Sequence, residues 1–309
     1  MQSKKTILRR GFADMSKHSL EVHDLVYRRG ERAILRGINL NLGNGIFGLL
    51  GSNGAGKTTL LRLVATILAP SKGAITFDGV DAFREKGTYR KSLGYLPQSF
   101  GLYPGMSIHE QLSYFAAMKG MSNTKREVDR LLPIVGFTKE DMRCPSQSLS
   151  GGMKQRLGIA IALIGSPALV ILDELTAGLD PVERTRLRFL LESIAQDAVV
   201  IISTHITQDV ELCCSEMSIL IGGTLKYMGS PHEVSESARG HVWQIDISCN
   251  DLERLKQLRR VVSVSNLSED MAKVRFTGNP IGKGEAPVSP TLEDAYVYQA
   301  TQCYVNDAL

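Results

Sequence analysis

Apolar and polar residues alternate along 19–29 and 33–42, a pattern that predicts two half-buried antiparallel strands. Residues 45–51 (GIFGLLG) form instead a nearly continuous apolar run, which is typical of a buried parallel strand. A glycine-rich turn follows this run. Apolar residues then recur at helical spacing along 57–70, which predicts a helix that Pro70 ends.

The middle of the chain has a helical pattern. After a further strand and turn at 74–80, residues 105–168 are predicted to be mainly helical. Thr124 and Glu127 have the spacing of a capping box, which makes Thr124 the expected cap of the helix that follows. Pro133 must end or kink that helix.

Two more buried strands are predicted at 168–174 and 198–204, with a helix at 181–195 between them. Strands that alternate with helices indicate a parallel sheet with right-handed crossovers. Residues 216–223 and 224–230 are expected to form a closing hairpin. The pattern therefore predicts an α/β fold.

The pattern changes from about Gly240 onward. The predicted elements there are a strand at 242–248, a helix at 251–260, strands at 261–267 and 271–278, and a helix at 291–300 begun by Thr291. We therefore expect a disordered basic tail at 1–18 (with a second start at Met15 as an alternative), a main domain at 19–235 whose helical subdomain covers about 105–168, and a small α+β accessory domain at 240–309.

Composition excludes some classes of protein. Apolar content of 43% and charged content of 22% are typical of a soluble globular protein, and a net charge of +4 over 309 residues is too small to indicate a nucleic-acid partner. The longest apolar stretch, 157–172, is broken at 165–167 and is shorter than the roughly 20 residues of a spanning helix. The 5 cysteines lack metal-ligand spacing, which favours a reducing compartment and thiols buried as small apolar groups.

Residues 51–59 (GSNGAGKTT) match the pattern G-x-x-x-x-G-K-[ST] between a buried strand and a helix, the context that this motif requires. Glycines let backbone N–H groups point at phosphate oxygens, Lys57 can reach the β and γ phosphates, and Thr58 can offer its hydroxyl to Mg²⁺. A tight turn alone would explain the glycines but not Lys57 and Thr58. The predicted nucleotide-binding residues are Gly51, Ser52, Asn53, Gly54, Ala55, Gly56, Lys57, Thr58 and Thr59.

The predicted strand 168–174 ends in two adjacent acids, where open α/β sheets bind ligands. Asp173 suits the coordination shell of Mg²⁺, directly or through water. Glu174 could polarise the water that attacks a γ-phosphate, and its alternative is a solvated acid without a catalytic role.

Three residues are weaker candidates on pattern alone. His205 follows the strand 198–204 and could bond a γ-phosphate or orient the water, although most histidines in such places are structural. Gln98 has a plain surface glutamine as its alternative, and Tyr27 could stack on an adenine ring but equally pack on its own sheet.

Several motifs occur in register. They are GSNGAGKT (51–58), YLPQ (95–98), LSGGMKQRL (149–157), LVILDE (169–174), AGLD (177–180) and STH (203–205). Their order and spacing resemble the nucleotide-binding subunit of ATP-binding cassette (ABC) transporters over about residues 19–235, and 149–157 resembles the signature segment of that family. The resemblance implies a P-loop NTPase fold with a RecA-like parallel-sheet core, an antiparallel β subdomain and a helical subdomain, ahead of the α+β appendix.

The resemblance also implies roles for single residues. Tyr27 would stack on adenine, and Gln98 would touch Mg²⁺ and the attacking water and link the site to a membrane subunit. Glu174 resembles the catalytic base, His205 the switch histidine, and Asp180 the residue that communicates across a dimer.

The same resemblance implies a head-to-tail dimer of two cassettes, identical or different, with two ATP molecules between them. Each ATP would lie on the P-loop of one subunit and be capped by Ser150, Gly151 and Gly152 of the other, where Ser150 caps a helix and Lys154 and Arg156 flank it. ATP binding would close the dimer and hydrolysis reopen it, which would move a separate transmembrane permease at the cytoplasmic face of the membrane.

Finer features resemble antibiotic and multidrug exporters: a lone cassette of this length, the segment 100–112 (FGLYPGMSIHEQL) and the terminal TLEDAYVY. In such exporters the segment Phe100–Met106 lies in the groove that receives the membrane subunit. A clustered exposure of Phe100, Leu102, Tyr103 and Met106 would favour docking over a plain surface loop.

Three residues depart from the common family pattern. Met153 replaces a glutamine, Leu175 a proline and Ala177 a serine. None of them removes a charged catalytic group, so ATPase activity is still expected, although Leu175 could loosen the turn that carries Glu174. Two alternatives remain open: a soluble ABC ATPase acting on nucleic acid or ribosomes, and a regulator that binds nucleotide without hydrolysing it.

Overall fold

The computed structural model describes residues 17–175, 179–280 and 284–306, with 303–306 as backbone only. The chain divides into two compact units: the described residues of Met1–Phe47 and Thr58–Ile202, and those of Gly48–Lys57 and Ser203–Leu309. This division does not test the boundary predicted near Gly240, which stays a prediction. Within the described ranges, each helix is too short or too polar to cross a membrane.

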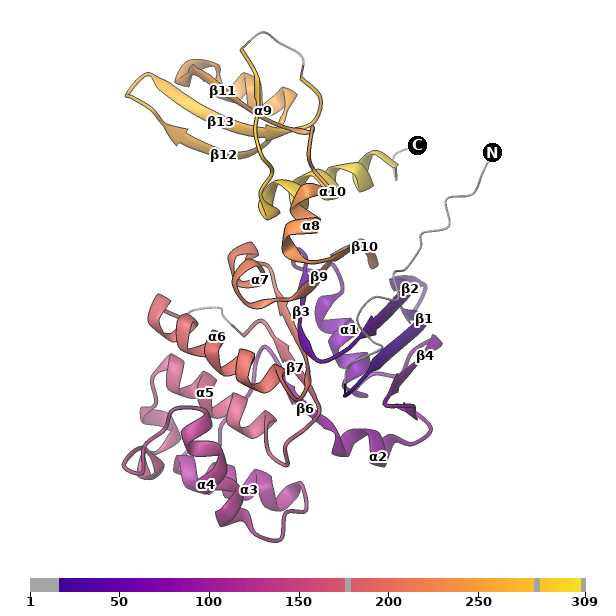
Figure 1. Cartoon of the computed structure of the whole chain (residues 1–309), viewed down its shortest axis with the longest axis vertical. Helices are drawn as coiled ribbons and strands as arrows, with labels where there is room; N and C mark the ends of the chain where they lie inside the picture. Colours follow the sequence, from indigo (N-terminus) through magenta and orange to yellow (C-terminus); the bar gives the residue numbers. More distant parts are fainter. Residues whose placement is uncertain (1–16, 176–178, 281–283, 307–309) are drawn as a thin grey trace. The chain divides into compact units, whose positions relative to one another are not determined.

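The first unit contains an antiparallel sheet whose strands alternate buried and exposed side chains. Its order is β2-β1-β4-β5, with β1 at Leu20–Arg29, β2 at Arg32–Leu42, β4 at Lys72–Phe77 and β5 at Val80–Asp81 (Figure 1). The buried positions are the apolar ones, so the alternation in the sequence correctly predicts both β1 and β2.

The same unit contains β7, β6 and the first residues of β3 and β8, and these buried strands have the order β3-β8-β7-β6. These are β3 (Gly45–Leu50), β8 (Val199–Thr204), β7 (Leu169–Asp173) and β6 (Leu93–Leu96). Strands β6 and β7 are parallel, and every residue of β7 and β8 is buried, which explains their continuous apolar runs. Helices α2 (Lys86–Lys91) and α6 (Pro181–Ala195) belong to this unit, and the expected α/β fold is confirmed.

Helix α1 runs from Lys57 to Val64, so the predicted helix 57–70 was too long. Thr66 takes a left-handed conformation with φ of +57°, and this ends the helix before Pro70. The guanidinium of Arg90 holds Thr66 there, since it donates to the Thr66 hydroxyl at 2.8 Å and to its carbonyl oxygen at 3.1 Å.

Three helices lie together in the first unit: α3 (Ile108–Met118), α4 (Thr124–Ile134) and α5 (Gly151–Ala162) (Figure 1). The predicted capping box at Thr124 was wrong, because the cap of α4 is Asn123, which accepts from the Arg126 N–H at 3.0 Å. Glu127 faces Arg130 instead, and this ion pair lowers the pKa of the Glu127 carboxyl. As expected, α4 ends just after Pro133. The 3₁₀ turns η1 (Asp141–Arg143) and η2 (Ser146–Ser148) precede α5.

The second unit contains the predicted hairpin, whose strands β9 (Glu216–Ile221) and β10 (Thr224–Gly229) pair antiparallel. The order here is β10-β9-β3, and α7 (Thr207–Cys213) and α8 (Pro231–Glu236) flank the hairpin in sequence. Beyond it, an antiparallel sheet has the order β12-β13-β11-β14. Its strands are β11 (Val242–Ser248), β12 (Arg260–Asn266), β13 (Met271–Thr277) and β14 (Ala286–Pro287), with η3 (Cys249–Asp251), α9 (Leu252–Leu258) and α10 (Leu292–Asn306).

The expected strand, helix, strand, strand and helix after Gly240 are therefore present. Thr291 precedes α10, and its N–H and hydroxyl both donate to Asp294 at 2.7 Å. Arg275 of β13 also donates to Asp294, at 2.8 Å, so one buried carboxylate joins the last helix to the sheet.

The cysteines were expected to be buried, and this holds only for Cys214. Cys144 and Cys213 are half-buried, Cys249 is exposed, and the side chain of Cys303 lies outside the described residues. Burial raises the pKa of the Cys214 thiol well above its usual value, which disfavours the reactive thiolate. The residues of 1–16, including the alternative start at Met15, also lie outside the described ranges.

Gly94 and Gly87 form a matched pair for testing this packing. A Cβ at Gly94 of β6 would lie 2.2 Å from the Ala162 carbonyl oxygen, whereas one at Gly87 of α2 would meet nothing within 4 Å. Gly94→Ala should lower the free energy of unfolding by about 1–3 kcal/mol. Gly87→Ala should raise it by about 1 kcal/mol, since alanine favours a helix. Urea unfolding followed by circular dichroism measures both, and equal stabilities would contradict the packing described here.

Candidate functional site

Residues 51–56 connect β3 to the start of α1. Gly54 and Gly56 have φ of +81° and +111°, which residues with a Cβ seldom adopt. Gly51 lies so close to β9 that a Cβ there would come within 2.7 Å of the Leu220 carbonyl oxygen. The backbone conformation and the packing of the loop therefore require the glycines of the motif. Ser52, Asn53 and Gly54 are exposed, and Ala55 is buried.

Lys57 begins α1, and its side chain folds back onto this loop. Its Nζ donates to the carbonyl oxygens of Gly51 at 2.7 Å and Ser52 at 3.2 Å, and the residue is 4% exposed. Thr58 and Thr59 follow, both half-buried. A cationic group beside a glycine loop at the N-terminus of a helix suits a phosphate ligand.

His205 lies between β8 and α7 and is exposed. The turn that carries it is held at both sides: the Ile206 N–H donates to Thr204 Oγ1 at 3.0 Å, and Thr204 Oγ1 donates to Asp209 at 3.3 Å. Asp209 is buried. His205, which directly follows β8, is thus held at the surface by a defined turn.

In the first unit, the acids at the end of β7 have different surroundings. Asp173 is 1% exposed, whereas Glu174 is half-buried and has φ of +50°. The Nε2 of the exposed Gln98 donates to Glu174 Oε2 at 2.6 Å. Two residues that are 76 positions apart in sequence are therefore brought together, as a shared role in hydrolysis requires.

Tyr95 of β6 shows how close the charge of Asp173 lies to the strand alongside. Burial, and secondarily the charge of Asp173, raise the pKa of the Tyr95 phenol. The direction of this shift is that expected for a phenol beside a buried carboxylate, because a second negative charge there is unfavourable.

The residues expected at Mg²⁺ carry donors that fit this ion when it is bound together with phosphate. No group of three or more His, Cys, Asp or Glu side chains within the described ranges could hold a metal alone. Mg²⁺ is commonly bound by one or two carboxylates together with substrate phosphates and water, so this finding is compatible with it. Asp173 offers a carboxylate, Thr58 a hydroxyl, and Gln98 an amide oxygen, since its Nε2 is the atom that donates to Glu174.

Helix α5 carries the signature segment. Ser150 is its N-cap as predicted, since its Oγ accepts from the Met153 N–H at 3.2 Å. A Cβ at Gly151 would meet nothing within 4 Å, so the backbone there is open to approach. A Cβ at Gly152 would lie 3.0 Å from Glu183 Cγ, so the packing of α5 against Glu183 favours a glycine at this position. Nothing in the structure explains the side chain of Met153.

Arg156 does not act as the flanking charge that we expected. Its Nη1 donates to the carbonyl oxygens of Val135 at 3.3 Å and Gly136 at 2.8 Å. Its guanidinium lies 4.8 Å from the centre of the Phe137 ring, and its Nε lies 3.5 Å from Glu183 Oε2. Arg156 is therefore an anchor between α5, the end of α4 and α6, whereas Lys154 is exposed as expected.

Asp180 caps α6, accepting from the N–H groups of Val182 and Glu183 at 2.9 Å. Tyr27 is half-buried on β1, opposite Leu35 of β2. The proposed roles of Asp180 in a dimer and of Tyr27 against adenine are not tested by these contacts. Ala177 lies outside the described residues.

The turn after Glu174 shows a contact that sequence reasoning missed. Leu175 is 2% exposed, and its carbonyl oxygen accepts from Gln155 Nε2 of α5 at 2.8 Å. The expected loosening at Leu175 is thus opposed by a hydrogen bond. The only sequence feature that could have pointed to this bond is a polar residue, Gln155, within the signature segment.

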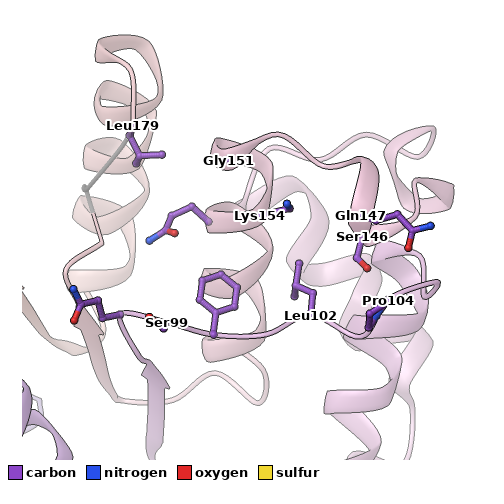
Figure 2. Close-up of a pocket in the computed structure, with 11 residues that line it drawn as sticks. Ser99, Leu102, Pro104, Ser146, Gln147, Gly151, Lys154 and Leu179 are labelled. Carbon is purple, nitrogen blue, oxygen red and sulfur yellow. The ribbon is translucent and has the colours of Figure 1, made fainter.

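A groove of about 670 Å³ opens beside α5 and is also lined by Gln98 and the loop that follows it. Figure 2 shows Leu102 and Pro104 on that loop, Gly151 and Lys154 on α5, and Ser146 and Gln147 on the neighbouring turn. Of the four apolar residues expected to be exposed together, only Tyr103 is exposed; Phe100, Leu102 and Met106 are half-buried. Phe100 is partly covered because it packs against Gly158, where a Cβ would come within 2.5 Å of its ring.

Residues 35–177 match the family model described as ABC transporter. The chain is 35% identical over 234 residues to the Nod factor export ATP-binding protein I of Rhizobium sp. (strain N33), covering 73% of this chain and 75% of that protein. It is 33% identical over 271 residues to the probable multidrug ABC transporter ATP-binding protein YbhF of Escherichia coli (strain K12), covering 82% of this chain. The chain spans only 46% of the length of YbhF.

Among solved structures, cbiO1 from Clostridium perfringens, part of the ABC transporter complex cbiONQ, is similar with a TM-score of 0.64 and 32% identity. The similarity covers 70% of this chain and 89% of cbiO1. The P-loop with its buried lysine, the Gln98–Glu174 pair and the capped α5 thus occur in a chain that resembles ATP-binding cassettes in sequence and in fold. The chain belongs to the ABC transporter family, as one of its ATP-binding proteins.

Proposed function

We propose that this chain binds and hydrolyses ATP as the nucleotide-binding subunit of an ABC transporter, and that it drives export through a separate permease at the cytoplasmic face of the membrane. The observation that carries the proposal is the hydrogen bond between Gln98 and Glu174. Gln98 lines the groove beside α5, and Glu174 is the carboxylate suited to activate water. The bond therefore connects the groove, which suits a docking partner, to the Glu174 carboxylate, which suits the activation of water.

The chemistry assigned to each residue follows from its environment. Lys57 and the glycine loop bind the phosphates, and the Glu174 carboxylate accepts a proton from the attacking water while Gln98 orients it. His205 hydrogen-bonds the γ-phosphate. Asp173, Thr58 and Gln98 would hold Mg²⁺, which would neutralise charge on the phosphates. Positioning and electrostatic stabilisation provide most of the rate, as in other phosphoryl transfers.

The signature segment supports a dimer with shared sites. Ser150 and Gly151 are exposed at the N-terminus of the 12-residue helix α5, where the helix dipole favours an anion. These residues supply no base and no P-loop of their own. We infer that they cap the γ-phosphate of an ATP bound to a second cassette, identical or different.

The direction of transport and the partner rest on the relatives and on the groove. Both relatives named above are ATP-binding proteins, one of a probable multidrug transporter and one of Nod factor export. The groove beside α5 has a mixed polar and apolar lining that suits a helix from a permease loop. The accessory residues 240–309 remain without an assigned role.

Replacing Lys57 by alanine removes the cation from the glycine loop. The affinity for a fluorescent ATP analogue should fall at least about 10-fold, because a hydrogen bond to a charged group contributes about 1.5–3 kcal/mol. Titration by fluorescence anisotropy measures this, and Lys86→Ala, an exposed lysine on α2, is the control. Equal affinities of Lys57→Ala and the parent chain would contradict the P-loop assignment.

Glu174→Gln keeps the size of the side chain and removes its basicity. The variant should bind the analogue within about twofold of the parent and lose at least about 100-fold in kcat, as loss of a general base predicts. Phosphate release at saturating Mg-ATP measures turnover, and Glu140→Gln, an exposed acid, is the control. Normal steady-state hydrolysis by Glu174→Gln would refute the catalytic assignment.

An affinity-tagged chain purified from detergent-solubilised membranes of its source should carry a protein with several hydrophobic spans. Leu102→Asp places a charge in the groove and should reduce recovery of that protein at least about 10-fold, since a buried unpaired charge strongly opposes binding. Leu258→Asp, at an exposed apolar residue of α9, is the matched control. Mass spectrometry identifies the partner; recovery of ribosomal proteins or nucleic acid in its place would support the soluble alternative.

A further inference from the structure

The backbone at Glu174 is held in a conformation that it does not prefer. Its φ of +50° lies in the left-handed region, which residues with a Cβ seldom occupy. Such a residue keeps this conformation only when its surroundings fix it. On the strand side, Asp173 and the rest of β7 are buried. The other side of Glu174 must therefore be fixed as well.

The contact on that other side comes from Gln155. Its Nε2 donates to the Leu175 carbonyl oxygen at 2.8 Å, one peptide unit beyond Glu174. The Leu175 side chain is 2% exposed, so the turn formed by Glu174 and Leu175 is held by packing and by this bond. At this position the family pattern has a proline, whose ring fixes φ; here the constraint is a hydrogen bond from another helix.

Gln155 lies on α5, the helix that Ser150 of the signature segment caps. It lies five residues after the cap Ser150, which is about 7.5 Å along a helix of 1.5 Å rise per residue. The next residue, Arg156, anchors the same turn of α5 to Gly136 and to Glu183. The N-terminus of α5 and the donor to the Leu175 carbonyl therefore belong to one anchored helix.

Gln155 also lines the groove beside α5, together with Gln98. Gln98 contacts the Glu174 carboxylate, and Gln155 contacts the backbone that follows it. Both side chains that hold the catalytic residue thus face one groove. An occupant of that groove would act on Glu174 through two amides at once.

We propose that Gln155 is a positioning residue for ATP hydrolysis: its side-chain amide holds the turn that carries Glu174 and ties the catalytic carboxylate to helix α5. This inference rests on the proposed function. A cassette whose signature segment is engaged by ATP on its partner then has its own Glu174 correctly placed. The two ATP sites of the dimer are thereby linked inside one subunit.

Two variants remove the donor in different ways. Gln155→Met keeps the length of the side chain, and Gln155→Glu keeps its shape but replaces the donating nitrogen by an oxygen. Gln155→Lys retains a donor at the end of a flexible chain. The matched control is Gln196→Met, at an exposed glutamine after α6. All are measured in the full chain for thermal unfolding, affinity for the fluorescent ATP analogue, and steady-state kcat and KM.

Gln155→Met and Gln155→Glu should lose about 10-fold or more in kcat, because displacement of a catalytic group by 1 Å can cost 10²-fold. Their analogue affinity and KM should stay within about twofold, since the P-loop is unchanged. Gln155→Lys should recover most of kcat. In the Glu174→Gln background, Gln155→Met should have no further effect on the residual rate, because it acts through Glu174.

Several results would overturn the proposal. Unchanged kcat in both donor-less variants would show that the bond does not position Glu174. Unfolding of both, or a parallel loss of analogue affinity, would make the contact a structural one. A further loss in the Glu174→Gln background would show that Gln155 acts elsewhere. If Glu174→Gln itself hydrolyses ATP normally, the proposed function fails before this inference is reached.

Discussion

The left-handed backbone at Glu174 is the constraint on which the arrangement around β7 depends. At Glu174, directly after the buried strand β7, the backbone turns at once and does not continue in the direction of the strand. The unfavourable conformation persists because the strand before it is buried and the carbonyl after it is bonded. Gln98 bonds the Glu174 carboxylate and Gln155 bonds the backbone that follows it, so both contacts act on this turn.

Helix α5 connects this site to the rest of the first unit. Arg156 joins it to the end of α4 and to α6, Gly158 admits the ring of Phe100, and Gly94 of β6 lies against its last turn. In such close packing, a glycine occurs where a neighbouring element leaves no space for a Cβ, and a charged side chain such as that of Arg156 connects the elements by hydrogen bonds. The packing explains why these elements are held where they are.

Much of this fold and site follows from the sequence. Alternation predicts β1 and β2, continuous apolar runs predict β3, β7 and β8, and the P-loop pattern predicts the turn and the helix that follow β3. The failures are informative because each depends on a contact distant in sequence. Arg90 ends α1 through Thr66, Asn123 takes the cap that Thr124 was expected to provide, and Arg156 is used for anchoring. Local pattern carries no information about such partners.

The composition of α5 has a consequence for its order. Its first two residues and Gly158 are glycines, each of which costs a helix about 1 kcal/mol relative to alanine. A helix of this length is marginal in water even with favourable residues. The helicity of α5 is therefore supported by its cap Ser150 and by the contacts that Arg156, Gly152 and Gly158 make with other elements. Its first turn, which has the least cover, will exchange its amide hydrogens with water before the buried turns around Leu157 and Ile159 do.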